Sequence, residues 1–146
     1  ENSHVVPALI RRFHEAKENN LEEVVVWGSG APRREFLYVD DMAKASLYLH
    51  NLDQTIYQEN TEPMLSHINV GIGIDVTIKE LAEIIMDVVC FTGELVFDTS
   101  KPDGTSRKLM NVDRLDLLGY RAPTSLQSGL QLAYADFLEN TSILRM

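Results

Sequence analysis

Residues 27–45 have the sequence Trp27-Gly-Ser-Gly-Ala-Pro-Arg-Arg-Glu-Phe-Leu-Tyr-Val-Asp-Asp-Met-Ala-Lys-Ala45. A short β-branched run, Val24 to Trp27, ends where the glycines begin, and paired aspartates open a helical pattern at the far end. Turn glycines after a strand, followed by an acidic residue at a helix start, favour strands and helices in alternation. The stretch therefore predicts an α/β chain. It also places one aromatic ring and two arginines around a single turn.

The flanking segments continue this alternation. Helical spacing or capping signals predict helices, and β-rich runs between them predict strands. Thr77 to Glu80 is a capping box, and Gly119 is a stop signal for a short helix. The expected helices cover residues from about 3–6 to 19, from Asp40 or Asp41 to 51, 77–88, 113–118 and from Ser125 onward; the expected strands are 24–27, 35–39, 66–70 and 94–98.

The composition excludes several classes of function. The 146 residues can bury one real core, and 45% of them are hydrophobic. The net charge of −9 disfavours a nucleic-acid binder, because phosphate backbones need a basic face. The longest apolar run is far below the ~20 residues that cross a bilayer, so no membrane partner is expected.

The cysteine and histidine positions limit the chemistry further. A lone cysteine, Cys90, excludes an internal disulfide and indicates a reducing compartment, so we expect a cytoplasmic protein. His14, His50 and His67 show no metal-ligand spacing, so we expect no metal. The chain starts in mid-pattern, without Met or a signal-peptide pattern, which suggests a fragment or a processed product.

Two arginine pairs and one tryptophan are candidates for binding a ligand with a flat ring and phosphates. Guanidinium groups bind phosphate oxygens bidentately, and the indole of Trp27 offers the ligand a stacking or edge contact. The structural alternative for Arg11 and Arg12 is a solvated helix face, on which adjacent side chains diverge. For Trp27 the alternative is a core or rim aromatic.

Other candidates have equally plain alternatives. His4 stands just before a helix, where an imidazole can exchange protons near neutral pH or simply lie at the surface. Gly71-Ile-Gly73 imitates a dinucleotide fingerprint but lacks its third glycine, which favours an ordinary turn. Lys101-Pro-Asp-Gly104 is a β-turn whose Asp103 could reach a ligand together with Lys108. Cys90 follows two valines, which favours an inert core position.

Two segments carry a family resemblance: Asn2-Ser-His-Val-Val-Pro-Ala-Leu-Ile-Arg-Arg-Phe-His14 and Pro63-Met-Leu-Ser-His-Ile-Asn-Val-Gly71. They resemble the C-terminal part of the GDP-L-fucose synthases, NADP-dependent epimerase-reductases of the extended short-chain dehydrogenase family. Val26–Gly30 and Phe97–Gly104 add to the match, which runs from about Asn2 to Leu138. The block Arg34-Glu-Phe-Leu-Tyr-Val-Asp-Asp is shared more widely among nucleotide-sugar enzymes.

The resemblance implies an activity and a set of site residues. Members of the family epimerise GDP-4-keto-6-deoxy-mannose at two sugar carbons and then reduce its keto group with NADPH. The similarity implies acid/base work for His4 and NADP contacts for Asn2 and His4. It implies that Arg34 binds the diphosphate; the adjacent Arg33 is expected to be solvated. The implied substrate-binding residues are Arg12, Trp27, Arg34, Asp103 and Lys108.

The same resemblance implies that other parts of the site lie elsewhere. The family's glycine-rich NADP loop, Ser-Tyr-Lys group and catalytic cysteine belong to the N-terminal part. This chain lacks a Tyr-x-x-x-Lys pattern, since Tyr38 and Tyr48 are followed four residues later by Met42 and Leu52. Cys90 stands where family members can have a glycine, so it is not the catalytic cysteine.

The implied architecture divides the chain. Residues of about 3–38 and 72–140 would form the substrate-binding domain, a small sheet with helices, and 39–71 would belong in part to a truncated Rossmann domain. Segments 40–51 and 66–70 would then expose apolar surface. We expect a homodimer for the full-length enzyme and no turnover by the isolated chain. The alternatives are another nucleotide-sugar epimerase or dehydratase, or a non-catalytic sugar-nucleotide-binding module.

Overall fold

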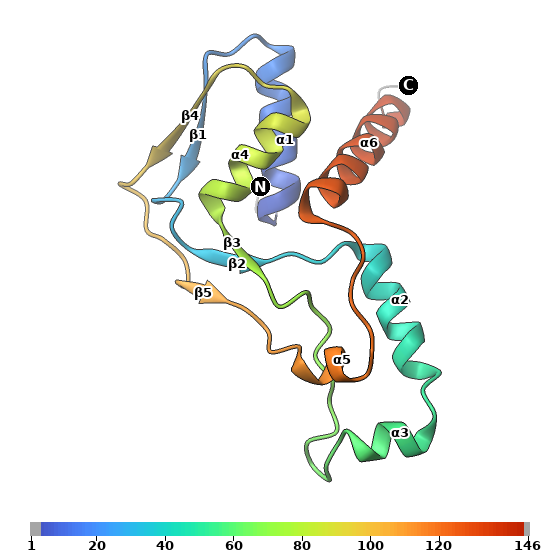
Figure 1. Ribbon diagram of the computed structural model, residues 1–146. Helices are drawn as coiled ribbons and strands as arrows, with labels where there is room; N and C mark the ends of the chain where they lie inside the picture. The colour runs from blue at the N-terminus through green and yellow to red at the C-terminus, as the bar shows by residue number, and fades with distance from the viewer. Residues whose placement is uncertain (1–3, 145–146) are drawn as a thin grey trace.

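A computed structural model describes residues 4–144 and confirms the α/β class (Figure 1). A parallel pair of strands and the helices packed against it form the upper part of the molecule, and helices joined by long loops form the lower part. In chain order the elements are α1 (Val5–Glu18), β1 (Glu23–Trp27), β2 (Arg33–Glu35), α2 (Val39–His50), α3 (Gln54–Glu59), β3 (Asp75–Thr77), α4 (Ile78–Val89), β4 (Glu94–Asp98), β5 (Arg107–Lys108), α5 (Asp113–Leu117) and α6 (Leu126–Leu144).

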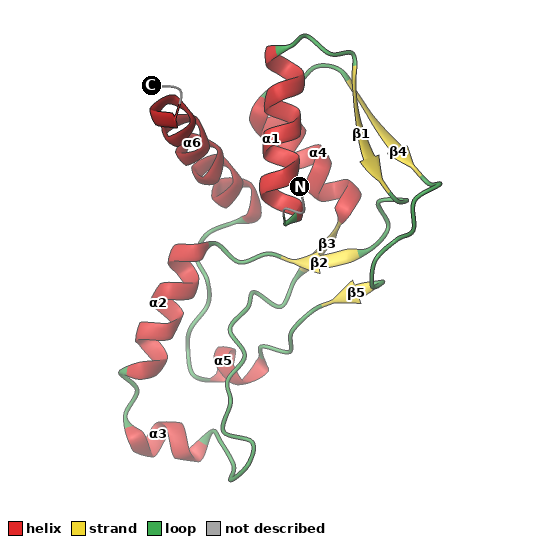
Figure 2. Ribbon diagram, turned by 180° about the vertical axis from the view of Figure 1, so that it is seen from behind, coloured by secondary structure: helices red, strands yellow, loops and turns green. Residues whose placement is uncertain are grey.

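Two small sheets organise the chain. β1 pairs in parallel with β4, and the register sets Trp27 beside Asp98 at their carboxyl ends. β2 is the centre of the second sheet, antiparallel to β3 and parallel to β5. This second sheet lies between the upper and lower parts, as the reverse view in Figure 2 shows. The turns that leave β1 and β4 therefore start side by side, and both lead toward β2 and β5.

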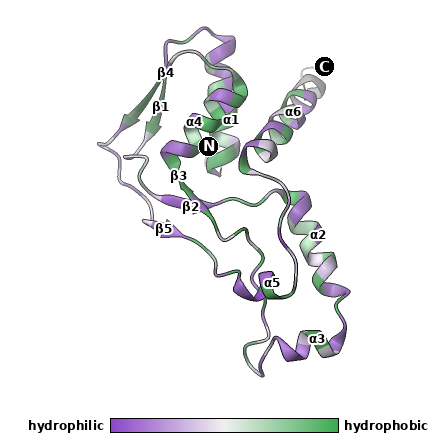
Figure 3. Ribbon diagram, viewed as in Figure 1, coloured by the Kyte–Doolittle hydropathy of each residue, from purple (hydrophilic) through white to green (hydrophobic). Residues whose placement is uncertain are grey.

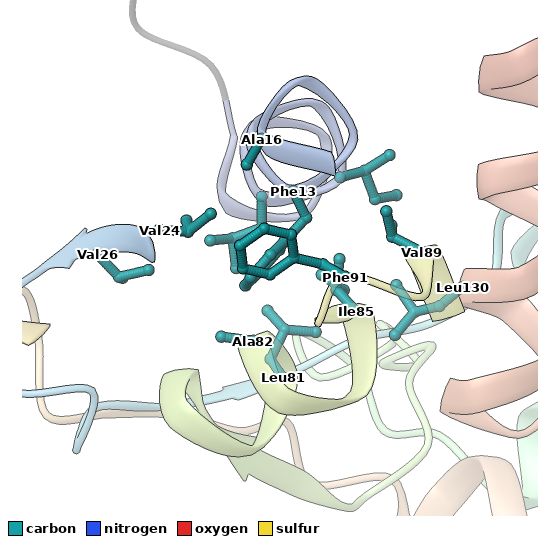
Figure 4. Close-up of a cluster of buried hydrophobic side chains, with 12 residues drawn as sticks. Phe13, Ala16, Val24, Val26, Leu81, Ala82, Ile85, Val89, Phe91 and Leu130 are labelled. Atoms are coloured by element: carbon teal, nitrogen blue, oxygen red, sulfur yellow. The ribbon is translucent and has the colours of Figure 1, made fainter. Parts of the chain in front are cut away.

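The hydrophobic core lies between the first sheet and α1, α4 and α6. Phe13 of α1 is fully buried, and its ring lies 5.7 Å from that of Phe91, centroid to centroid (Figure 4). Leu81 and Ile85 cover it from α4, and Leu130 extends the cluster to α6. Figure 3 shows hydrophobic residues concentrated in β1, β4 and α4. The helices expected from about residues 3–6 to 19, over 77–88 and from Ser125 onward are confirmed, and each contributes side chains to this core.

Helix α4 has the ends that its sequence predicts. Thr77 Oγ1 accepts the Glu80 amide proton, and the Glu80 carboxylate accepts the Thr77 amide proton, which is a complete capping box. Cys90 ends the helix in the left-handed conformation, at φ 58°. Its side chain is exposed, so the expected core position is wrong. A left-handed C-terminal residue must turn the chain out of the helix, which carries its side chain to the surface.

Two expected strands differ from the structure. The strand expected at 35–39 is instead Arg33–Glu35, and residues 36–38 are a loop that leads into α2. Residues 66–70 form no strand. Side chains rather than a neighbouring strand bind the carbonyls here: Tyr57 Oη–H donates to Ser66, and Arg114 donates to Leu65 and His67. A run of β-forming residues becomes a strand only beside a pairing partner.

Helix α2 begins earlier than the paired aspartates suggest. Its N-cap is Tyr38, which makes no side-chain cap, and both aspartates lie within the first turn. Acidic groups there are favoured by the helix dipole. Asp41 is fully buried and its Oδ2 accepts the Thr124 amide proton at 2.9 Å, so it fastens the segment before α6 to α2. The prediction that one aspartate caps the helix is wrong, because the turn of the chain occurs at Tyr38.

Large apolar side chains are exposed along the lower part of the molecule. On α2 the exposed fraction of Val39 is 68% and that of Leu47 is 62%, while Met64 in the next loop is 97% exposed. Exposed apolar clusters of this kind mark surfaces that another surface covers. The apolar surface expected for the helix after the paired aspartates is confirmed. None of the helices within residues 4–144 is long and apolar enough to span a bilayer.

Candidate functional site

Four of the expected substrate-binding residues line one cavity of about 260 Å³. They come from four separate segments: Arg12 from α1, Trp27 from the end of β1, Arg34 from β2 and Asp103 from the loop after β4. The parallel pairing of β1 with β4 brings the second and fourth of these segments together. Residues 91 positions apart in the sequence are thereby collected into one site, which the chain order alone does not reveal.

Among the described residues, the two arginines of this cavity have no acidic partner. Arg34 Nη1 donates to the Arg33 carbonyl at 2.7 Å, and the guanidinium is half-buried. Arg12 is exposed on α1. Within residues 4–144, no carboxylate lies within ion-pair distance of either group. In a chain of net charge −9, two cations that share one cavity and lack acidic partners favour an anionic ligand.

Trp27 supplies a flat aromatic surface at the edge of the cavity. Its exposed fraction is 67%, and Lys101 Nζ lies 5.6 Å from the ring centroid. An exposed indole contributes nothing to the core, so the core alternative is wrong for this residue. Its position beside two unpaired arginines suits a ligand with a planar base joined to phosphates.

Asp103 lines the cavity but its carboxylate is already engaged. Ser29 donates to it twice, from its amide at 2.8 Å and from its hydroxyl at 2.6 Å. These hydrogen bonds, from the hydroxyl first, hold the pKa of the Asp103 carboxyl below its ordinary value. The group is therefore ionised at neutral pH and directed at Ser29.

The remaining expected site residues lie outside the cavity lining. Lys108 is exposed on β5, in register with Arg34 of β2, so its backbone runs beside that of the arginine. His4 is exposed immediately before α1, and its carbonyl accepts the Ala8 amide proton. Val5, the next residue in the sequence, does line the cavity, so His4 is directly adjacent in the chain to a lining residue. Asn2 lies outside the described residues.

Arg33 stays partly exposed, with 40% of its side chain accessible to solvent, but it also pairs with an acidic residue, which was not expected. Its Nε donates to Asp75 Oδ1 at 2.9 Å, and Arg107 Nε donates to Asp75 Oδ2. The bonds from Arg107 and Arg33 hold the pKa of the Asp75 carboxyl below its ordinary value. Neighbouring residues on a strand point to opposite faces, so Arg33 and Arg34 were bound to differ. The missed signal is Asp75, an acidic residue 42 positions later that faces the first arginine.

The glycine pair at 71–73 is a turn around a carboxylate of the chain itself. Glu35 Oε1 accepts the amide protons of Ile72 and Gly73 at 2.6 and 2.7 Å, and Oε2 accepts that of Met110. A Cβ on Gly71 would lie 2.4 Å from Glu35 Oε1. Those amides have an anionic partner already, so the turn interpretation is confirmed and the phosphate-cradle alternative is wrong.

A larger cavity of about 710 Å³ also has Arg34 in its lining. Its second cation, Arg121, already donates to Asp116 at 3.0 Å, and the 71–74 turn forms another wall. It therefore offers an anion less than the smaller cavity does. In the described part of the chain, no group of His, Cys, Asp and Glu residues could hold a metal ion.

Known proteins resemble this chain over its whole length or part of it. The model of the NAD dependent epimerase/dehydratase family matches residues 1–71. The GDP-L-fucose synthase of Escherichia coli is 58% identical over 144 residues, which are 99% of this chain and 45% of that protein. This chain thus spans less than half the length of that relative.

Solved structures share the fold as well. The Campylobacter jejuni GDP-mannoheptose C4 reductase with NADP bound is 36% identical and superposes with a TM-score of 0.79 over 94% of this chain and 46% of that one. The Naegleria fowleri GDP-L-fucose synthetase bound to NADP is 30% identical, with a TM-score of 0.79 over 96% of this chain and 41% of that one. Both are similar along nearly the whole of this chain.

Proposed function

We propose that this chain, which matches the NAD dependent epimerase/dehydratase family over residues 1–71, is the substrate-binding part of a GDP-L-fucose-forming enzyme. The whole enzyme would epimerise GDP-4-keto-6-deoxy-D-mannose at carbons 3 and 5 and reduce carbon 4 with NADPH. One observation carries the proposal: Arg12, Trp27 and Arg34 line the same cavity, and neither arginine has an acidic partner among the described residues.

The cavity residues divide between the two ends of a nucleoside diphosphate. Arg34 and Arg12 bind the diphosphate. Their guanidinium groups can bind phosphate oxygens without first breaking an ion pair with a carboxylate of the described residues. Trp27 contacts the nucleotide base across its exposed ring. Lys108, in register with Arg34, adds positive charge at the same end. The described residues bring these groups within one small region of an acidic chain.

His4 is the proposed acid/base residue of the epimerisation. Protons next to a carbonyl leave and return only with a positioned acid and base, and an imidazole exchanges protons near neutral pH. His4 precedes α1, the helix that carries Arg12 to the cavity, and it is exposed to an incoming ligand. We place its role at the sugar end of the substrate, opposite the diphosphate.

NADP supplies the hydride of the proposed reduction, and this chain offers it little. The glycine turn at 71–73 encloses Glu35 rather than a phosphate. The residues from 4 to 144 thus do not fit a dinucleotide phosphate loop, and the proposed contribution of this chain is limited to contacts from Asn2 and His4. The main cofactor site belongs to the part of such enzymes that lies outside this sequence.

The exposed apolar face of α2 supports the proposed division into domains. Residues of about 3–38 and 72–140 would bind substrate, and 39–71 would belong in part to a dinucleotide-binding domain whose remainder covers Val39, Met42 and Leu47. A homodimer of the full-length enzyme and a cytoplasmic location are parts of the same proposal. Burial of this face would remove these exposed apolar side chains from water.

The proposal predicts that the 146-residue chain alone turns over no substrate. It has cations for a diphosphate but no Tyr-x-x-x-Lys pair for hydride transfer. NADPH absorbance is followed with GDP-4-keto-6-deoxy-mannose and equal amounts of the chain or of the Escherichia coli relative, which serves as the positive control. Steady oxidation of NADPH by the chain alone would contradict this division of labour.

A further inference from the structure

We propose that Asp75 is a positioning residue of the nucleotide site, because its carboxylate joins β2 to β5 and thereby holds Lys108 beside Arg34. The inference rests on the proposed function, which assigns these two cations to the diphosphate. Asp75 itself does not line the cavity of about 260 Å³. No sequence motif distinguishes it, and its place in the site becomes visible only when the second sheet forms.

The register of the strands divides the second sheet into two faces. Paired residues of neighbouring strands lie on the same face, and successive residues of one strand lie on opposite faces. Arg33 is paired with Arg107, and Arg34 is paired with Lys108. Asp75 is paired with the position two residues beyond Arg33, so it shares the face of Arg33 and Arg107. Arg34 and Lys108 therefore lie side by side on one face, and the acidic residue lies on the other.

On its own face, the Asp75 carboxylate connects two strands. Arg33 Nε donates to Oδ1 at 2.9 Å and Arg107 Nε donates to Oδ2, so each oxygen accepts from a different strand. Arg33 Nη2 also donates to the Asp75 carbonyl at 2.9 Å. Only 4% of the Asp75 side chain is exposed. A buried charge is costly unless it is paired, so the carboxylate and the two arginines hold one another in place.

The strand that carries Lys108 is short. β5 consists of two residues at the edge of the sheet, and β2 is its neighbour there. The Arg33 amide donates to the Ser106 carbonyl at 2.8 Å, just before β5. Short isolated strand pairs are marginally stable in water, so a charged contact matters where the ladder has so few bonds. Loss of this contact would release β5 from β2, and Lys108 would move with it.

Charge alone predicts the opposite effect on a diphosphate. Removing a carboxylate from an acidic chain makes its surroundings more positive, which should strengthen the binding of an anion. If Asp75 positions Lys108, its removal should instead weaken binding, because one of the two proposed diphosphate cations is displaced. The direction of the change therefore distinguishes the two accounts.

The test is Asp75→Asn in the 146-residue chain, with GDP affinity followed by Trp27 fluorescence. The amide keeps one acceptor oxygen where the carboxylate has two, so it cannot accept from both arginines in the same geometry. GDP affinity should fall by about 10-fold in Asp75→Asn and by about 10-fold in Lys108→Gln. In the Lys108→Gln background, Asp75→Asn should cost less than about 2-fold, because both changes act through one cation.

The matched control is Asp116→Asn, which makes the same change of charge. Asp116 of α5 accepts from Arg121 Nη2 at 3.0 Å in an exposed pair away from the second sheet. Exposed pairs contribute little to stability, so GDP affinity should stay within about 2-fold of that of the unaltered chain.

A second variant, Arg107→Gln, covers the case in which Asp75→Asn does not fold. It leaves the Asp75 carboxylate paired with Arg33 and releases β5 alone. GDP affinity should fall by about 5-fold in this variant, and by less than about 2-fold when Lys108 is already glutamine. Arg121→Gln, its matched control for charge, should bind GDP within about 2-fold of the unaltered chain.

Amide hydrogen exchange tests the bridge in the absence of ligand. The Arg33 amide donates to the Ser106 carbonyl, so its exchange reports whether β5 stays on β2. This exchange should be about 10-fold faster in Asp75→Asn and Arg107→Gln, while that of the Phe13 amide in the core stays unchanged. In the two control variants both amides should exchange as in the unaltered chain.

Three results would overturn the inference: equal exchange of the Arg33 amide in all variants, unchanged or tighter GDP binding by Asp75→Asn, or an equal loss of GDP affinity in both backgrounds. The last would indicate a general loss of structure rather than an effect through Lys108. If the unaltered chain binds no GDP, the proposed function fails, and exchange of the Arg33 amide then decides on the bridge by itself.

Discussion

Replacing Arg34 with glutamine should weaken GDP binding to the chain by about 100-fold, or roughly 3 kcal/mol. The reason is that its guanidinium has no acidic partner among the described residues, so its charge is available to a phosphate. Arg34→Lys should lose less, because the charge remains while the bidentate geometry is lost. Titration calorimetry with GDP measures both effects directly.

A matched control stands on α1. Arg11 lies next to Arg12 but is not part of the cavity lining, and its Nε lies 3.9 Å from Glu15 Oε1. Arg11→Gln should bind GDP as the unaltered chain does, and Arg12→Gln should bind it more weakly. A GDP affinity that survives in Arg34→Gln but falls in Arg11→Gln would contradict the assignment of the cavity.

Replacing Phe13 with alanine should lower the free energy of unfolding by about 3–5 kcal/mol. Its ring is fully buried at the centre of the core and contacts Phe91, so its removal leaves a cavity among α1, α4 and the first sheet. The loss is a large part of the ~5–15 kcal/mol by which domains are stable. Urea unfolding followed by circular dichroism measures it.

The comparison variant for this prediction is Leu21→Ala. Leu21 is 54% exposed in the turn after α1, so its truncation should change the free energy of unfolding by less than about 1 kcal/mol. If the two variants unfolded at the same urea concentration, the core would not be centred on Phe13. GDP binding by Phe13→Ala should fall with the folded fraction, since α1 also carries Arg12.

Much of the upper part of the fold could be predicted from local sequence. The capping box at Thr77 and the apolar spacing that follows it specify α4 without any distant contact. The runs that end at Trp27 and Asp98 predict β1 and β4, although nothing local indicates that they pair in parallel. These local signals are enough to predict the elements, because each signal lies in the same helix or strand that it specifies.

The lower part and the cavity needed long-range information. The expected strand at 66–70 found side-chain donors instead of a partner, and β5 has two residues, too few for any periodic signal. Ser29 and Asp103 meet across 74 positions, and Arg33 and Asp75 across 42. Family resemblance indicated four residues that line the cavity, Arg12, Trp27, Arg34 and Asp103, but not that Asp103 accepts hydrogen bonds from Ser29.

The central claim is that Arg12, Trp27 and Arg34 form a pocket for a guanosine diphosphate sugar. Its most direct test is a titration of the 146-residue chain with GDP, UDP and dTDP, followed by the fluorescence of Trp27, the single tryptophan of the sequence. Saturable quenching by GDP at a Kd at least about 10-fold below those of UDP and dTDP is the expected result, since the base must add ~1.4 kcal/mol of discrimination to a shared diphosphate. A folded chain that binds none of the three, or that prefers UDP or dTDP to GDP, would contradict the claim.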